Sequence, residues 1–254
     1  QEYISNGEIE QKFGYAKLGF DYYKGHTLSL RALKKKVKPH FLGHMLTNNG
    51  YIFDLTLGYE WNNFIDGISL NEDYGTYGAN LQPNNTFRFD LLFKKFDSFR
   101  DVIFIENASK LSFITNKDAD DFFYFFGGGM PGLKGYTFYD PTLTGWGIFM
   151  HSIHFRKLLL NSQYLSLKDF IGFNKLSLGL IGQFGKVVSD DTVDVMKDYK
   201  FSYGVELRSK GFLFYGYPAA VTLEQHYPLR NYDSLWEESW WKEGKTYIKF
   251  LFDF

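Results

Sequence analysis

The sequence is dominated by segments in which apolar and polar residues alternate. Side chains of a β-strand point alternately to its two faces, so each such segment predicts a strand with one apolar and one polar face. The final segment, 245–254, alternates most clearly along the whole of its length. Its apolar face carries Ile248, Phe250, Phe252 and Phe254. A chain built from such segments has to place one face of every strand in an apolar environment.

About ten segments of this kind follow one another along the chain. The clearest cover 51–61, 86–97, 102–115, 147–156, 176–187, 201–208, a stretch ending near Tyr227, and 245–254. Glycine and polar residues predict turns or loops at 24–26, 62–85, 116–121, 189–198, 210–211 and 229–243, and the long loop over 62–85 leaves room for one weak strand. No helical heptads and no linker are recognisable. We therefore expect a single all-β, antiparallel domain over 1–254.

Two architectures could accommodate the apolar faces. A soluble sandwich would bury them against a second sheet, whereas a membrane barrel would turn them to lipid and the polar faces to a wet lumen. The polar faces carry charges of opposite sign, such as Glu206 and Arg208. Such groups are costly in a dry core and cost little in a water-filled lumen. The sequence therefore favours a transmembrane β-barrel of about 10–12 strands.

The composition excludes several functional classes. Aromatic residues make up 20% of the chain, with 28 Phe and 19 Tyr, which favours strands over helices. The net charge of −1 provides no positive field for nucleic acid. The absence of cysteine excludes a disulfide scaffold, a thiolate metal site and a cysteine nucleophile.

Signals for membrane helices and targeting are missing from the sequence. No run of about 18 apolar residues is present, so we expect no transmembrane helix. The first residues carry no signal peptide, and we expect either that it has been removed or that residue 1 lies within a longer chain. Trp236, Trp240 and Trp241 fit an aromatic girdle at a membrane interface better than they fit a platform for a ligand.

The sequence contains no recognisable catalytic or metal-binding motif. The six histidines do not form a zinc-protease pattern, and no nucleophile elbow is present. The glycines at 127–129 are not followed by the Lys-Ser/Thr pair of a phosphate-binding loop. We expect a protein that is not an enzyme and that holds no cofactor and no metal.

A glycine-rich stretch over 122–136 ends in a Leu-Lys-Gly-Tyr tetrad. Glycine permits positive φ and close approach of backbones, so this segment can fold back on itself and present a cation and an aromatic ring. It resembles the inward-folded loop of the outer-membrane assembly and two-partner-secretion barrel superfamily, whose motif is Val-Arg-Gly-Phe or Val-Arg-Gly-Tyr. The matching residues are Gly127, Gly128, Gly129, Leu133, Lys134, Gly135 and Tyr136.

The later strands follow the same order as in that superfamily. A strand ending at Phe155, a Gln183-Phe184-Gly185 step, a hairpin and a closing strand come after the tetrad. The terminal Phe254 resembles the last residue of bacterial outer-membrane barrels, and the glycine run also looks like the barrel that ends TolB-like propeller proteins. The resemblance implies a lumen loop over 122–146 and a closing strand over 245–254, either in a small barrel or in the C-terminal part of a sixteen-stranded one.

The chain departs from the family at the ion pair between the loop arginine and acidic residues of the strands that follow. The family arginine is Lys134 here, and a lysine is a point charge rather than a bidentate fork. The acidic partners expected from the family correspond to His154 and Gln183, neither of which is an acid. By alternation the nearest acids on the same face are Glu206 and Glu224. We expect Lys134 to contact one of these acids, or only Gln183 and backbone carbonyls.

The resemblance implies a function at the bacterial outer membrane. It predicts a surface-antigen-type barrel that contacts outer-membrane lipid and other envelope proteins, and that inserts or transports polypeptide. The alternative is a barrel that anchors a periplasmic or surface partner without transport.

Overall fold

The computed structural model describes most of the chain. The described residues are 3–5, 8–10, 23–37, 49–71, 76–162, 165–167, 171–189, 198–213, 217–229 and 243–252. The expected aromatic girdle at 236–241 and the terminal Phe254 lie outside them, as does the side chain of Phe252.

The described residues form β-strands almost throughout. The strands are β1 (Tyr3–Ser5), β2 (Glu8–Glu10), β3 (Tyr23–Val37), β4 (Gly50–Asn71), β5 (Thr76–Phe99), β6 (Ile103–Ile114), β7 (Phe125–Phe126), β8 (Thr144–Gly145), β9 (Gly147–Leu160), β10 (Leu165–Leu167), β11 (Ile171–Val188), β12 (Lys200–Leu213), β13 (Tyr217–Leu229) and β14 (Lys245–Phe252). Two short 3₁₀ helices, η1 (Asp121–Phe123) and η2 (Pro141–Leu143), lie between β6 and β9. Among the described residues, no helix is long and apolar enough to cross a membrane.

The chain forms two compact units. The smaller comprises Gln1–Thr27 and Glu60–Asn85, and the larger comprises Leu28–Tyr59 and Thr86–Phe254. In the smaller unit, the hydroxyl of Tyr23 donates to Glu60 at 2.8 Å. The candidate site described below lies in the larger unit.

Nine strands lie side by side in one large sheet. Their order is β14-β13-β12-β11-β9-β6-β5-β4-β3, and β10 pairs with β11 off this path. Each pairing whose register is described is antiparallel, as the alternation predicted. The sheet is not closed: β14 and β3 are the ends of its order, so the closed barrel of about 10–12 strands is not formed by the described residues.

Three predicted breaks between strands are wrong. Residues 24–26 lie inside β3, residues 210–211 lie inside β12, and most of 62–85 belongs to β4 and β5. Gly211 occupies its position because a Cβ there would lie 1.8 Å from the carbonyl oxygen of Gly172 on the neighbouring strand. This glycine therefore serves a close approach of two backbones and does not form a turn.

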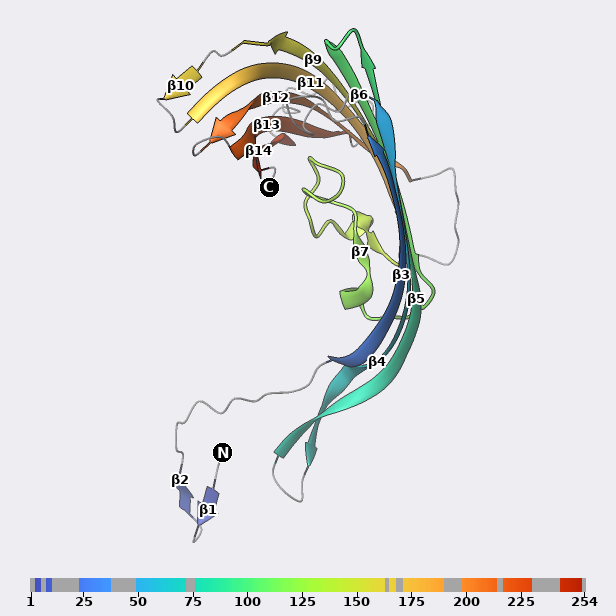
Figure 1. Ribbon diagram of the computed structural model, residues 1–254. Helices are drawn as coiled ribbons and strands as arrows, with labels where there is room; N and C mark the ends of the chain where they lie inside the picture. Colours follow the sequence, from blue (N-terminus) through green and yellow to red (C-terminus); the bar gives the residue numbers. More distant parts are fainter. Residues whose placement is uncertain are drawn as a thin grey trace. The chain divides into compact units, whose positions relative to one another are not determined.

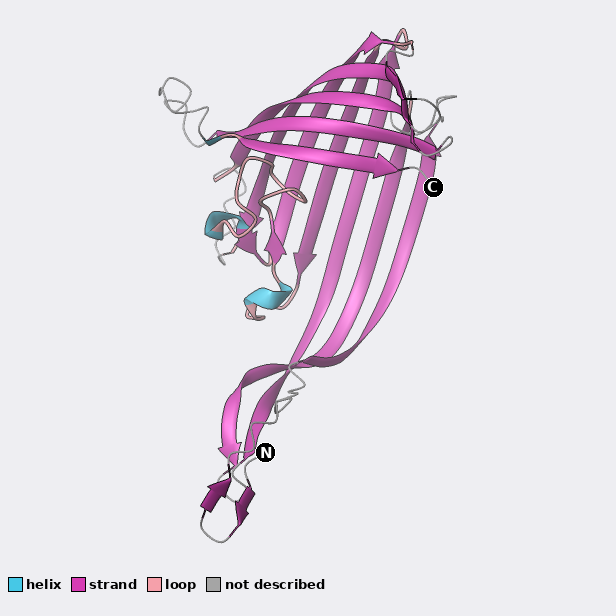
Figure 2. Ribbon diagram, turned by 90° about the vertical axis from the view of Figure 1, so that its left-hand side faces the viewer, coloured by secondary structure: helices cyan, strands magenta, loops and turns pink. Residues whose placement is uncertain are grey.

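The segment between β6 and β9 packs on one face of the sheet. Figures 1 and 2 both show it against the concave side of the strands. We call this side the loop-side face and the opposite side the outer face. A small apolar cluster of Ile114, Ala119, Phe125 and Ile148 anchors the start of the segment.

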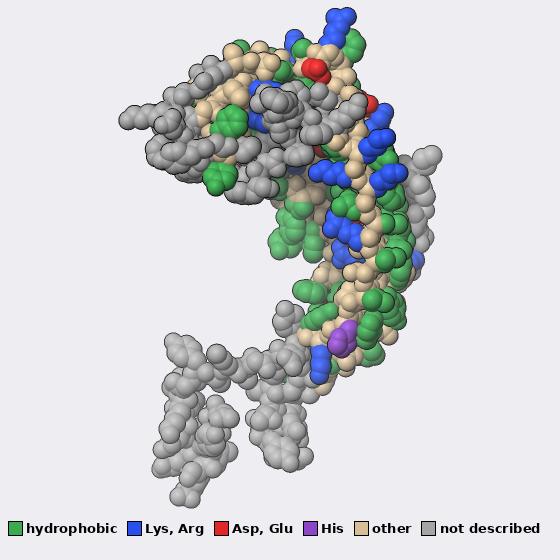
Figure 3. Space-filling view, in the orientation of Figure 1, with side chains coloured by type: hydrophobic (Ala, Val, Ile, Leu, Met, Phe, Trp, Pro, Cys, Tyr) green, Lys and Arg blue, Asp and Glu red, His purple; other side chains and the backbone are tan. Residues whose placement is uncertain are grey.

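The two faces of the sheet have opposite polarity. The strand register places Phe155, Leu180 and Val205 side by side on the outer face, and Figure 3 shows apolar side chains along the outer border of the sheet. These residues are 40, 58 and 47% exposed. By contrast, Arg156 and Glu206 on the loop-side face are 5 and 1% exposed. The sheet therefore buries its polar face and exposes its apolar face.

Candidate functional site: a charged network beneath a folded-in loop

The tetrad Leu133 to Tyr136 is positioned by close backbone contacts. The amide of Leu133 donates to the carbonyl of Gly127 at 2.7 Å, so the segment folds back on itself. At Gly128, a Cβ would lie 1.9 Å from the carbonyl oxygen of Thr137. The glycine run therefore makes the tight return that its composition predicted.

Gly135 combines a positive φ of 97° with a close approach to β13. A Cβ at this position would lie 2.9 Å from the backbone nitrogen of Pro228. The amide of Gly135 also donates to the hydroxyl of Tyr247 at 3.2 Å. A glycine is therefore required here on both conformational and steric grounds.

Replacing Gly135 with alanine is expected to lower the free energy of unfolding by about 1–3 kcal/mol. Alanine is strained at this positive φ, and its methyl group would be too close to the backbone of Pro228. Urea unfolding in detergent micelles measures this loss. Gly182→Ala is the matched control, because a Cβ at Gly182 meets nothing within 4 Å. Equal stability of the two variants would contradict the requirement for glycine at position 135.

Lys134 is buried and paired. Its side chain is 7% exposed, and its ammonium donates to a carboxylate oxygen of Glu224. Its backbone amide donates to Oε1 of Gln183 at 3.1 Å. The lysine therefore contacts Glu224, one of the two acids that alternation suggested, and also Gln183, which was the expected alternative partner.

Glu224 connects the loop to the last two strands of the sheet. Besides Lys134, it accepts a hydrogen bond from Lys249 at 2.8 Å and lies 3.1 Å from Nε2 of His226. The carboxylate is 1% exposed. Because two lysines neutralise it, its burial does not leave an isolated charge.

Apolar burial and a second anchor hold the rest of the tetrad. Leu133 and Tyr136 are 1 and 3% exposed and cluster with Leu143. The hydroxyl of Tyr136 lies 3.0 Å from the carbonyl oxygen of Phe201 and 3.3 Å from that of Leu229, to which it donates. The lysine and the tyrosine thus fasten the loop to four strands: β11, β12, β13 and, through Glu224, β14.

A second charged cluster lies on the same face, centred on Arg156. Its Nε donates to Glu206 at 2.7 Å and its Nη1 donates to Glu106 at 2.8 Å. Its Nη2 donates to Nδ1 of His154 at 2.9 Å. Arg208 adds a hydrogen bond to Glu206 at 3.1 Å. One guanidinium therefore connects β6, β9 and β12.

Gly179 on β11 makes room for this connection. The register places it between Arg156 and Glu206, so the pair must reach across it. A Cβ at Gly179 would lie 3.3 Å from Cγ of Arg156 and 3.2 Å from Cβ of Glu206. The missing side chain lets the two charged groups meet above the strand.

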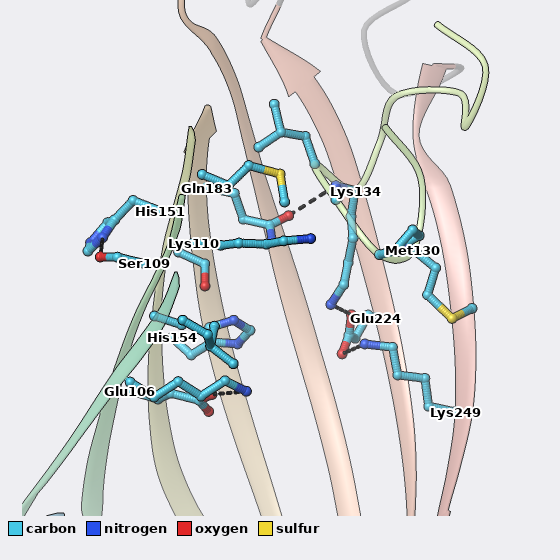
Figure 4. Close-up of a pocket in the computed structure, with 18 of the residues that line it drawn as sticks. Glu106, Ser109, Lys110, Met130, Lys134, His151, His154, Gln183, Glu224 and Lys249 are labelled. Carbon is cyan, nitrogen blue, oxygen red and sulfur yellow. Dashed lines mark hydrogen bonds and ion pairs between the residues drawn. The ribbon is translucent and has the colours of Figure 1, made fainter. Parts of the chain in front are cut away.

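The two clusters border one polar cavity of about 370 Å³. Figure 4 shows Lys134, Glu224 and Lys249 on one side of it and Glu106 and His154 on the other. Met130 and Leu133 contribute from the loop segment.

The candidate residues from the sequence do not all meet at one point. Gln183 and Glu224 contact Lys134, whereas His154 and Glu206 belong to the Arg156 cluster. On the end strand β14, Ile248 and Phe250 are 60 and 63% exposed on the outer face.

Sequence reasoning did not select several residues of the network. These are Glu106, Arg156, His226, Tyr247 and Lys249. Alternation does place them on the polar face. Their pairing depends on strand register, which the sequence pattern does not specify.

The chemistry available here is that of ion pairing. Among the described residues, no group of three or more His, Cys, Asp or Glu side chains is arranged to hold a metal ion. The carboxylates are engaged by arginine or lysine, which favours a role in holding the loop to the sheet. No protein-family model matches the chain, and no curated protein matches it either.

Proposed function

We propose that the large sheet is part of a bacterial outer-membrane β-barrel, with its outer face in lipid and its loop-side face towards a lumen. The inverted polarity of the sheet carries this proposal. A soluble protein rarely exposes a contiguous apolar surface of this kind, whereas a membrane barrel requires one. The apolar row of Phe155, Leu180 and Val205 extends through Leu207 and Leu223 to Ile248 on β14.

In this proposal the segment 121–146 is a plug held within the lumen. Its charged tetrad contacts the loop-side face through buried groups that would be unfavourable in contact with lipid. Among the described residues, β3 and β14 are the two ends of the sheet order. They would pair with further strands to close the barrel, since an open strand edge exposes unsatisfied backbone groups.

Single-cysteine labelling tests the proposed orientation, and the chain has no cysteine of its own. In lipid vesicles, Val205→Cys is expected to resist a water-soluble maleimide and to react with a lipid-dissolved one. Lys245→Cys, at the start of β14, is a positive control for access from water. Labelling of Val205→Cys by the water-soluble reagent at the control rate would contradict the membrane location.

We propose that the protein is not an enzyme and that it acts in insertion or transport of polypeptide at the outer membrane. The folded-in loop and the outer edge of β14, which pairs with no strand of the described residues, support this role. An open edge is a template for another strand. An anchor without transport is the second candidate, and it is favoured by the buried ion pair between Lys134 and Glu224, which fixes the loop to the sheet.

The folding rate of a second outer-membrane barrel distinguishes the two functions. Vesicles that contain this protein are expected to accelerate the folding of an added, urea-unfolded barrel protein. The same vesicles carrying a heat-unfolded sample of the protein are the control. An unchanged rate would rule out assembly activity and leave the anchoring function.

A further inference from the structure

The cavity on the loop-side face carries more positive than negative charge. Six cationic residues border it: Lys94, Lys110, Lys134, Arg156, Arg208 and Lys249. Three carboxylates neutralise part of this charge, namely Glu106 and Glu224 in the lining and Glu206, which pairs with both arginines. Six cations against three carboxylates leave an excess of three positive charges.

Lys110 is the cation that the network does not use. It lies on β6 and extends into the cavity towards Gln183 and Lys134 (Figure 4). Its ammonium has no hydrogen bond or ion pair with any residue that the structure describes. A cation aimed into a cavity without a protein partner is available to a ligand.

The surrounding cations are already fixed in position. Lys134 and Lys249 are held by Glu224, and Arg156 is held by Glu106 and Glu206. Ligand binding would therefore require little reordering of side chains, which is a major cost of forming a complex. The volume of about 370 Å³ falls within the range of roughly 300–1,000 Å³ for small-molecule sites.

We propose that this cavity binds a small phosphate-bearing anion, for which inorganic diphosphate is the best-matched probe. At neutral pH diphosphate carries about three negative charges, which equals the excess in the cavity, and lysine and arginine are the residues that bind phosphate oxygens. The site goes beyond the proposed barrel function and depends only on groups of the loop-side face.

Isothermal titration of the folded protein with diphosphate tests the site. Lys110→Gln is expected to weaken binding about tenfold, because a charged hydrogen bond is lost. The substitution breaks no ion pair in the described part of the chain. Lys95→Gln makes the same chemical change at an exposed lysine outside the cavity and is expected to bind like the wild type.

Two outcomes would overturn the proposal. One is an absence of heat from diphosphate with folded wild-type protein at low salt, and the other is equal affinity in Lys110→Gln. Circular dichroism and thermal unfolding establish that each variant is folded, so a failure of binding is separate from a failure of folding. Protection of Val205→Cys in vesicles reports on the barrel independently of either result.

A comparison of ligands identifies the source of the phosphate. Inorganic diphosphate and farnesyl diphosphate share the anionic group but differ in the lipid tail. Equal affinities would support a free anion as the ligand, and tighter binding of the prenyl compound would support a lipid headgroup. Both results support the same cationic site.

Discussion

Arg156→Met is expected to lower the free energy of unfolding by about 3–5 kcal/mol, because it breaks two buried ion pairs at once. Glu206 then keeps only Arg208, and Glu106 keeps only Lys94 at 3.9 Å. The side chains of Arg156, Glu206 and Glu106 are 6, 1 and 19% exposed, so water does not replace the lost partner at Glu206. Methionine retains much of the side-chain length and removes only the charge and its hydrogen bonds. Urea unfolding in detergent micelles, followed by tryptophan fluorescence, measures the change.

Arg31→Met is the matched control for this substitution. Arg31 also forms a two-bond pair with a carboxylate, Asp54, but its side chain is 60% exposed. Solvent screens such a pair, so the unfolding midpoint is expected to remain close to that of the wild type. A wild-type midpoint for Arg156→Met would show that the cluster does not hold β6, β9 and β12 together.

A compensating substitution tests whether the loss of stability in Arg156→Met comes from the lost charge rather than from lost packing. Adding Glu106→Gln to Arg156→Met removes the carboxylate that has lost its close partner, while Glu206 stays paired with Arg208. Part of the lost stability is then expected to return, because neutral groups are cheaper to bury than unpaired ions.

Glu224→Gln is the second substitution with a large expected effect. The carboxylate joins Lys134 of the loop to Lys249 and His226. An amide cannot neutralise the buried ammonium of Lys134 or the half-buried one of Lys249. We expect a loss of about 3–5 kcal/mol in the free energy of unfolding. We also expect the loop to leave the sheet more often, because the ammonium of Lys134, without its carboxylate partner, is better stabilised by water than by the buried site.

Limited trypsin digestion measures the opening of the loop. Cleavage after Lys134, which is 7% exposed in the folded state, is expected to become roughly 10–100 times faster in Glu224→Gln, because proteolysis follows the population of the open form. Asp97→Asn is the control, since it breaks an ion pair with Lys95 that is exposed on both sides. Wild-type protection of Lys134 in Glu224→Gln would mean that Tyr136 and the backbone contacts hold the loop by themselves.

Much of the strand structure could be predicted from alternation. The segments at 147–156, 176–187 and 201–208 all lie within observed strands, and the last strand begins at Lys245 as expected. Strand ends were predicted less well. Gly211 resembles a turn residue, but the structure uses it where the backbone of Gly172 approaches closely. A single segment of sequence does not contain that information, because the neighbouring strand is distant in the chain.

The candidate site was predicted in outline. Alternation suggested two acids as possible partners of Lys134. In the structure Lys134 forms an ion pair with Glu224, whereas Glu206 forms one with Arg156. Glu206 and Glu224 are direct neighbours in the pairing of β12 with β13. Like charges so placed repel each other, so each needs a cation of its own. Arg156 reaches Glu206 only because Gly179 lies between them, a relation that the register creates.

The sequence by itself determined the all-β class, the two-faced strands and the loop that folds back, because period-two alternation and glycine conformational freedom are local properties. Only the tertiary structure decided which polar side chains meet, since ion pairs between strands depend on register and on the gaps that glycines leave. It also decided which face is covered: the segment over 121–146 packs on the polar side, and the apolar side remains exposed.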